Sequence, residues 1–231
     1  MLVWDEGAPI IMILRRLALM AALIAIIHGA SAREARSDCA QDTIGLGPEY
    51  ANGSSGAFLG KARGQTFTVR DTLLTFLRVW RVASQDSGWQ IGMHPYITET
   101  DSTGAPYQYP DYHIVWEGPT LVIPNGDGVH PIEFKWTFDP PLALPHRGKY
   151  AFFLFQDPCL AYWDILATDQ PWLYPDGDLF VTGRSSCRFI GPVSISRPYT
   201  TYDLVFQIGF CTDAAVPTRR TTWGHLKLLY R

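Results

Sequence analysis

The stretch NGDGVHPIEFKWTF, residues 125–138, joins a turn signal to a strand signal. From Ile132 to Phe138 every second residue is apolar, and the residues between them are Glu, Lys and Thr. A period of two places the apolar side chains on one face of a half-buried β-strand. Asn-Gly and Asp-Gly supply the positive φ angles that tight turns need, so we expect NGDG to form a hairpin in front of this strand.

Similar strand-like segments follow one another along most of the chain, and Gly- or Pro-containing turns separate them. About ten short strands without an amphipathic helix between them predict an all-β fold, a two-sheet antiparallel sandwich of jelly-roll-like form. A parallel α/β fold would need crossover helices, and immunoglobulin-like topology is the alternative. The predicted strands are residues 64–69, 75–83, 88–100, 112–118, 120–124, 132–138, 149–156, 161–167, 178–183 and 202–210.

The N-terminal residues resemble a secretory signal. The basic pair Arg15-Arg16 precedes the apolar run 17–27 and the small residues 30–32. This order predicts export with cleavage after Ala32, and the acidic residues ahead of the basic pair favour translation from Met12. The run is shorter than the roughly 18 to 20 residues of a membrane-spanning helix, so we expect no membrane span after cleavage. An uncleaved anchor is the alternative.

The chain divides into four parts, and its charge is nearly balanced. Lys and Arg number 19 against 22 for Asp and Glu, a net charge of −3. This balance gives no cationic field for a polyanion, so we expect no nucleic-acid partner. The predicted parts are a signal at 1–32, an extended lead-in at 33–60, the β-sandwich domain at 61–211, and a linker with a short tail helix at 212–231.

All four cysteines, Cys39, Cys159, Cys187 and Cys211, follow the predicted signal. An even number of cysteines in an exported chain predicts two disulfides, for which three connectivities exist. We favour Cys159–Cys187 as a local bridge and Cys39–Cys211 as a link between the N-terminal segment and the last strand. Zinc is the alternative, although no C-x-x-C and no close Cys/His pair is present.

Motifs of catalytic centres are weak in this sequence. The nearest approach to a nucleophile turn, GRSSC at 183–187, lacks the second Gly of G-x-S-x-G, and H-E-x-x-H is absent. Glu99, Glu117 and Glu133 are the acids that could line one sheet face for glycoside hydrolysis. Glu117 lies beside a Gly-Pro turn and Glu133 alternates with an apolar stripe, so we interpret both as solvated. We assign no catalytic residue.

Two acidic turns, NGDG and PDGDLF, could contribute oxygen ligands to a calcium ion. Calcium takes six to eight oxygens, so each loop would need backbone carbonyls and a second segment. Asp176 and Asp178, with Asp169 nearby, are the better candidates. The alternative is that both loops are simply tight turns.

Aromatic residues in two loops are the candidate ligand-binding residues. Large rings on alternating strands are ordinarily core, but rings between Pro, Asp and Gly are harder to bury. Such rings can pack on the face of a sugar or fill a pocket of a protein partner. The alternative is that they anchor their own loops. The candidates are Tyr107, Tyr109, Tyr112, Trp172 and Tyr174.

The final stretch, TTWGHLKLLYR at 221–231, predicts a short helix behind a linker. Its apolar residues share one face, and ten residues are too few for a helix that is stable alone. The helix therefore docks, either on its own domain as a plug or on a sorting component as an address, which we favour. The recognition residues would be Trp223, Leu226, Lys227 and Tyr230.

One long run carries a resemblance to a known family. Residues 116–156, which include FDPPLALPHRGKY at 138–150, resemble an exported bacterial β-sandwich domain of the choice-of-anchor type, as does GQTFT at 64–68. The resemblance covers roughly residues 60–211 and implies a sandwich fold and a bacterial cell-surface or secreted location. Carbohydrate-binding modules share this architecture. The ending W-G-x-L-K-x-x-Y-R resembles the tails of some other exported bacterial proteins.

These features together favour a secreted, non-catalytic binding or cell-surface module, with a polysaccharide or another surface protein as its partner. A carbohydrate-active hydrolase or lyase on the same jelly-roll scaffold is one alternative. A structural component of the envelope is another. We expect no cofactor other than the calcium considered above.

Overall fold

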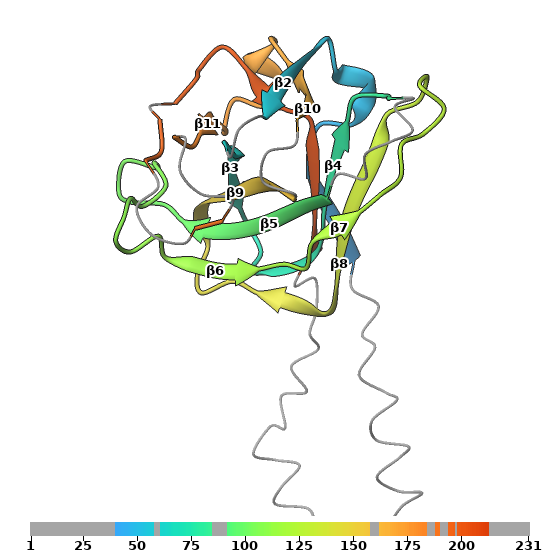
Figure 1. Ribbon diagram of the computed structural model, residues 1–231. Helices are drawn as coiled ribbons and strands as arrows, with labels where there is room; N and C mark the ends of the chain where they lie inside the picture. Colours follow the sequence, from blue (N-terminus) through green and yellow to red (C-terminus); the bar gives the residue numbers. More distant parts are fainter. Residues whose placement is uncertain are drawn as a thin grey trace, which may run out of the picture. The chain divides into compact units, whose positions relative to one another are not determined.

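The computed structural model describes residues 40–57, 61–84, 92–157, 162–183, 188–189, 194–196 and 198–212 (Figure 1). The predicted signal and the tail, with Trp223, Leu226, Lys227 and Tyr230, lie outside the described residues. Residues 40–213 group into one compact unit. Within the described part of this unit, no helix has the length and apolar character needed to cross a membrane.

The predicted all-β sandwich is confirmed, because the described strands form two antiparallel sheets packed against each other. Sheet A has the order β1-β13-β4-β10-β12, with β2 paired to β10 and β8 paired to β4. Its strands are β1 (Ala40–Gly45), β2 (Gly53–Ala57), β4 (Leu73–Arg81), β8 (Ile132–Ala143), β10 (Trp163–Thr168), β12 (Asp203–Leu204) and β13 (Phe206–Thr212).

Sheet B has the order β11-β3-β9-β5-β6, with β7 paired to β5. Two three-residue 3₁₀ helices, η1 (Pro48–Tyr50) and η2 (Pro171–Leu173), lie in connections. The strands of sheet B are β3 (Arg63–Val69), β5 (Gly92–Glu99), β6 (Ile114–Glu117), β7 (Leu121–Val122), β9 (Gly148–Asp157) and β11 (Leu179–Val181).

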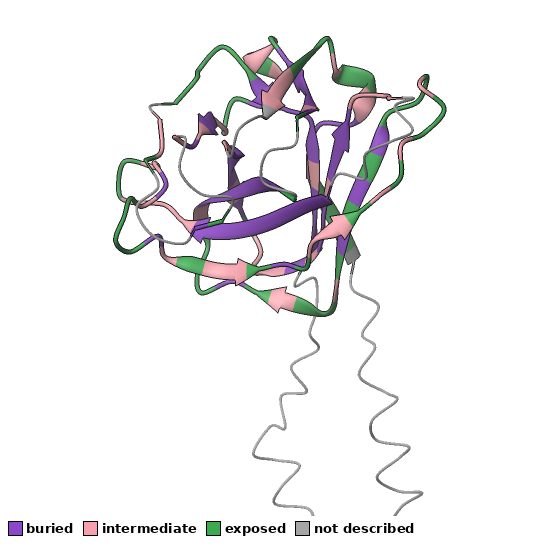
Figure 2. Cartoon of the chain, in the orientation of Figure 1, coloured by how far each residue is buried: buried purple, intermediate pink, exposed green. Residues whose placement is uncertain are grey.

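Strand β9 is buried on both faces. Phe152 and Leu154 belong to the core between the two sheets, whereas Phe153 and Phe155 belong to a second apolar cluster on the other face of sheet B. Phe189 covers that second face, with ring centroids 5.1 and 5.0 Å from Phe153 and Phe155. A continuous apolar run such as KYAFFLFQ is what a strand covered on both sides requires. Figure 2 shows the neighbouring strand β5 buried along most of its length.

The expected hairpin at NGDG is wrong. The strand before it, β7, pairs with β5 in sheet B, and the strand after it, β8, pairs with β4 in sheet A. The turn therefore carries the chain from one sheet to the other. Asp127 shapes it by accepting hydrogen bonds from the backbone N–H groups of Val129 and His130, both at 2.8 Å, and these bonds hold the pKa of its carboxyl well below the usual range. The side chain of Arg81 donates to Asn125.

Part of the expected lead-in belongs to the sandwich. Residues 40–45 form β1, which pairs with β13 in sheet A, and residues 53–57 form β2, which pairs with β10. The sandwich therefore begins before residue 61. The sequence of β2, GSSGA, has low β-propensity, so the backbone hydrogen bonds to β10 rather than its side chains decide that it is a strand.

A buried pair of polar side chains ties the two sheets together. In β3, Gln65 donates from Nε2 to Asp203 Oδ1 of β12 at 2.7 Å, and its Oε1 accepts the backbone N–H of Leu204 at 2.9 Å. Asp203 is buried, and its Oδ2 has no hydrogen-bond partner. Burial raises the pKa of Asp203 to about 7, with a further contribution from Asp178, although the bond from Gln65 acts in the opposite direction.

We expect Asp203→Asn to remove most of the pH dependence of stability between about pH 4 and pH 7. Over this range the folded protein holds a proton on Asp203 that the unfolded chain has lost, so the free energy of unfolding falls as pH rises. The total fall is about 4 kcal/mol, and it ends above pH 7, where both states are ionised. Urea unfolding of the wild type and the variant at pH 4.5 and pH 8 measures it.

The matched control is Asp42→Asn in the edge strand β1, where the side chain is exposed. This variant should keep the pH dependence of the wild type. Two results would contradict this expectation. One is a wild-type protein that is equally stable at pH 4.5 and pH 8. The other is an Asp203→Asn variant whose stability falls between pH 4.5 and pH 8 as much as that of the wild type.

Candidate binding site

A cavity of about 370 Å³ is lined by residues of β2 at the edge of sheet A and of β3 and β11 in sheet B. We call it the tyrosine pocket. The segment in front of β12 supplies the remaining wall, and it is held to β11 by the hydrogen bond from the backbone N–H of Tyr199 to the carbonyl of Leu179, at 2.8 Å. The pocket is lined by Ser54, Ser55, Gly56, Lys61, Arg63, Leu179, Val181, Tyr199 and Tyr202.

The small residues of β2 leave room for the pocket. A Cβ atom at Gly56 would lie 2.8 Å from Oδ1 of Asp164 and 3.4 Å from the hydroxyl of Tyr162. Only glycine fits this position without moving those groups, and glycine in a strand often marks a place where another group approaches the backbone closely. By contrast, the nearest atom to a Cβ at Gly53 would be 3.9 Å away.

Arg63 supplies a buried positive charge at the pocket. Its side chain is 8% exposed, Nε donates to Ser55 Oγ at 2.8 Å, and one Nη donates to the carbonyl oxygen of Ala62 at 3.4 Å. Burial lowers the pKa of Arg63, and Tyr199 and Asp164 partly oppose this effect. A guanidinium remains charged in proteins, so the pocket holds a permanent cation.

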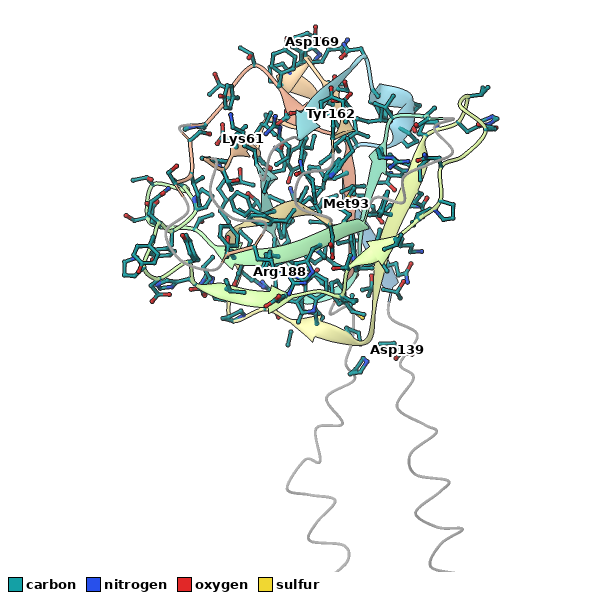
Figure 3. The ribbon with its side chains drawn as sticks, in the orientation of Figure 1. Lys61, Met93, Asp139, Tyr162, Asp169 and Arg188 are labelled. Atoms are coloured by element: carbon teal, nitrogen blue, oxygen red, sulfur yellow. The ribbon has the colours of Figure 1, made fainter. Side chains whose placement is uncertain are left out.

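Three tyrosine rings at or near the pocket are exposed. Tyr199 and Tyr202 line it and are 47% and 45% exposed, and Tyr162 is 61% exposed. The hydroxyl of Tyr162 donates to both carboxylate oxygens of Asp164, at 3.1 and 3.0 Å, and this bond raises the pKa of the phenol. In Figure 3, Lys61 and Tyr162 lie toward the same end of the sandwich, away from Asp139. The rings can therefore offer faces to a ligand.

The five aromatics predicted from sequence are found in two loops and have different environments. Tyr107, Tyr109 and Tyr112 lie between β5 and β6, and Trp172 and Tyr174 lie between β10 and β11. Trp172 is 69% exposed and Tyr109 is 52% exposed.

Two of the five rings belong to apolar clusters. Tyr112 packs against Phe189 with centroids 4.5 Å apart, and Tyr174 packs edge-on against Phe206 at 5.1 Å. Both are buried and present no free face to a ligand.

Tyr107 packs against a second polar group, which we call the histidine–carboxylate cluster and which is made of Glu99, Asp111, His113 and His146. Its ring stacks on that of His113, with centroids 3.7 Å apart. His113 Nδ1 lies 3.0 Å from Glu99 and Nε2 lies 3.3 Å from Asp111, while His146 Nε2 is 3.3 Å from Glu99. His113 has a φ of 47°, a strained value for a residue with a side chain. Three members of the cluster line a second hollow of about 490 Å³.

The other two acids considered from the sequence have separate partners. Glu117 accepts a hydrogen bond from the hydroxyl of Tyr96 at 3.1 Å and lies 2.9 Å from Nε2 of His94. Burial, with the bond to Glu117, raises the pKa of Tyr96. Glu133 lies 3.5 Å from Arg78 on the outer side of sheet A. Glu117 and Glu133 thus lie in different sheets.

The three candidate calcium ligands do not form a common site. The carboxylate of Asp169 accepts a hydrogen bond from the side-chain amide of Asn52, and the carboxylate of Asp178 is 3.3 Å from Lys149. In the residues that the structure describes, no group of three His, Cys, Asp or Glu side chains could hold a metal ion.

Among the four cysteines, Cys211 is the one that lies in the described residues. It is buried in β13 and is disulfide-bonded. Cys39, Cys159 and Cys187 lie outside the described ranges, so both predicted pairings stay predictions.

The fold and the pocket define a two-sheet β-sandwich with an aromatic-flanked polar pocket at the sheet edge. No family model matches the chain, and a search of the curated proteins finds no match to it. The resemblance to choice-of-anchor domains therefore stays a prediction.

Sequence reasoning missed the pocket residues. Tyr199 and Tyr202 lie in PYTTYD, which has the same Pro, Asp and aromatic composition as the two loops with candidate aromatics. The predicted strand 202–210, however, includes Tyr202. This composition is the signal that could have found them. Arg63 carried no signal, because a charged residue is expected at the surface.

We expect Gly56→Ala to lower the free energy of unfolding by about 0.5 kcal/mol, because the added Cβ displaces the carboxylate of Asp164, which is the acceptor of Tyr162. Gly53→Ala in the same strand is the matched control. It should leave the free energy of unfolding unchanged or raise it by a few tenths of a kcal/mol, since alanine lowers the conformational entropy of the unfolded chain. Urea unfolding compares them, and equal stability of the two variants would mean that the floor of the pocket is not tightly packed.

Proposed function

We propose that this chain is an exported, non-catalytic binding module that takes a carbohydrate into the tyrosine pocket. The observation that carries the proposal is the placement of two half-exposed rings, Tyr199 and Tyr202, beside a pocket whose floor is made of Ser and Gly. The proposal keeps the class of ligand expected from the sequence and moves it to different residues.

The chemistry of the pocket suits a sugar. A sugar ring has C–H groups that pack on an aromatic face and hydroxyl groups that need hydrogen-bond partners at its edge. Tyr199 and Tyr202 supply the faces, and Ser54, Ser55 and Arg63 supply polar groups. Ligand pockets typically combine apolar or aromatic walls with a few placed polar groups in about 300 to 1,000 Å³. The tyrosine pocket, at about 370 Å³, fits one end of an oligosaccharide.

Export supports a ligand outside the cell. The signal-like N-terminus predicts secretion, and the disulfide state of Cys211 fits an oxidising compartment. The pairing of Ala40 with Thr212 brings the start of β1 beside the end of β13, which favours the predicted Cys39–Cys211 bridge. We propose a secreted or cell-surface location on this basis.

The proposal predicts that Tyr199→Ala and Tyr202→Ala each weaken binding to a glycan by about 1 to 3 kcal/mol, the range for truncation of an aromatic anchor. A glycan array with the exported protein finds the ligand, and isothermal titration calorimetry measures the loss. Tyr109→Ala, an exposed tyrosine that does not line the pocket, is the matched control and should bind as the wild type does.

Two results would contradict this prediction. An array without any bound glycan would end the carbohydrate proposal. Binding that is lost in Trp172→Ala or Tyr109→Ala but kept in both pocket variants would assign the ligand to the loop aromatics expected from the sequence.

A second candidate function is a carbohydrate-active enzyme at the histidine–carboxylate cluster. The observation that favours it is the strained backbone of His113, held between Glu99 and Asp111 beside a hollow of about 490 Å³. Carboxyl and imidazole groups in contact can hold and move a proton, which general acid–base chemistry requires.

If the cluster is an active site, the protein cleaves a polysaccharide, and Glu99→Gln lowers the rate of cleavage by at least about 100-fold. A positioned acid or base contributes about 10² to 10⁴ in rate. Glu133→Gln, on the other sheet, is the control and should keep full activity. A reducing-sugar assay over a panel of polysaccharides measures both. If wild-type protein cleaves none of them, or Glu99→Gln cleaves as well as wild type, the cluster is a structural tie of the loop.

A further inference from the structure

The guanidinium of Arg63 has neutral partners only. Its two hydrogen bonds go to the hydroxyl of Ser55 and the carbonyl of Ala62, and none of the ion pairs among the described residues includes it. The half-buried Arg78 differs, since it is 3.5 Å from Glu133, whereas the buried Arg81 also has a neutral partner, Asn125. A buried cation without a carboxylate partner is costly unless something else compensates its charge.

Donor groups of Arg63 remain available to a ligand. A guanidinium has five N–H donors, and the two bonds above use two of them. No atom of Arg63 is among the sealed polar atoms without a partner in the described part of the chain, whereas Nε of Arg81 is. The unused N–H groups of Arg63 therefore face accessible space, and the space that Arg63 lines is the tyrosine pocket.

The lining of the pocket is cationic. Lys61 joins Arg63 in the wall, and no Asp or Glu is present among the described residues that line it. Asp164 acts on Arg63 through space and is itself engaged by the hydroxyl of Tyr162. Asp164 thus stabilises the charge of Arg63 in part, without forming an ion pair with it among the described residues.

We infer that the tyrosine pocket takes the carboxylate of an acidic sugar, with the carboxylate on Arg63 and the sugar ring against Tyr199 and Tyr202. This inference rests on the proposed function and narrows its ligand to uronate-containing oligosaccharides. Two parallel N–H donors of a guanidinium match the two oxygens of a carboxylate, and such charge-assisted pairs are about twice as strong as neutral ones. The planar fork also fixes the orientation of the sugar ring relative to the tyrosine faces.

The test uses pairs of oligosaccharides that differ only in charge. Oligomers of galacturonate, glucuronate and mannuronate and the methyl ester of each are titrated into the exported full-length protein by calorimetry. We expect at least one acid to bind about tenfold or more tightly than its own ester, because esterification removes the charge and one acceptor oxygen and keeps the ring. The affinity of that acid should fall as salt is raised from 50 to 300 mM.

Variants assign the effect to the pocket. Arg63→Lys keeps the charge and removes the fork, and it should reduce the preference for acid over ester by about tenfold. Because Arg63 is buried, near-UV circular dichroism checks that the variant folds. Lys61→Gln, at a less buried position of the same wall, gives a second test and should weaken binding of the acid more than that of the ester. Arg147→Gln, exposed in the turn before β9, is the charge-matched control and should bind as wild type.

The outcomes separate this inference from the proposed function. If neutral glycans bind through Tyr199 and Tyr202 while every acid binds no better than its ester, the inference is overturned and the carbohydrate proposal stands. If an acid binds more tightly than its ester and both Arg63→Lys and Lys61→Gln keep this preference, the carboxylate binds at another site and the inference is overturned. If no glycan of either kind binds, both fail.

Discussion

The burial of β9 on both faces is the constraint from which much of this structure follows. The run from Tyr150 to Phe155 in β9 has an apolar or aromatic side chain at every position and cannot leave one face in water, so the outer face of sheet B needs a cover as well as a core. Phe189 and Tyr112 provide part of that cover, which explains why a tyrosine between Pro, Asp and His is buried. The loop between β5 and β6 is thereby committed to packing. The β2 edge of sheet A has no such task, and Tyr199 and Tyr202 remain half-exposed beside it.

The pocket at that edge depends on residues that contribute little to stability. Strand β2 has no large side chain, so it adds backbone hydrogen bonds to β10 and almost no apolar burial. Arg63 is taken out of water beside it and bonds only to neutral oxygens. Both features lower the stability of the fold relative to a filled, apolar edge. Residues that break local rules in this way are found preferentially where a protein binds something, and the rest of the sandwich has a core large enough to tolerate them.

The sequence was sufficient for the elements whose pattern repeats, and insufficient where neighbours decide. Alternation from Ile132 to Phe138 predicted β8 and its buried face correctly. It could not show that NGDG joins two sheets, because a turn sequence specifies backbone angles and not the partner of the next strand. GSSGA reads as a linker, and only pairing with β10 makes it a strand. In the loops, Tyr109 and Tyr112 are three residues apart with similar neighbours, yet only Tyr109 is exposed, since loops have no period from which to read burial. The burial of Arg63 could not be predicted for the same reason, because β2 and the segment before β12 form its environment.

The two candidate sites differ in how far their polar groups are already satisfied. In the histidine–carboxylate cluster, both ring nitrogens of His113 and both carboxylate oxygens of Glu99 are engaged within the cluster, so a ligand would have to replace existing bonds. A cluster of this kind stabilises the loop that carries it and gains little by binding. Arg63 is in the opposite situation: it is desolvated, held in place by Ser55 and left with unused donors. Arg63 is already desolvated before a ligand binds, so binding does not add this cost again. A donor that is already fixed in place loses little entropy on binding. Arg63 thus offers hydrogen-bond donors that are fixed and unused, whereas the groups of the histidine–carboxylate cluster are already engaged. This difference is the physical reason for proposing that the ligand binds in the tyrosine pocket.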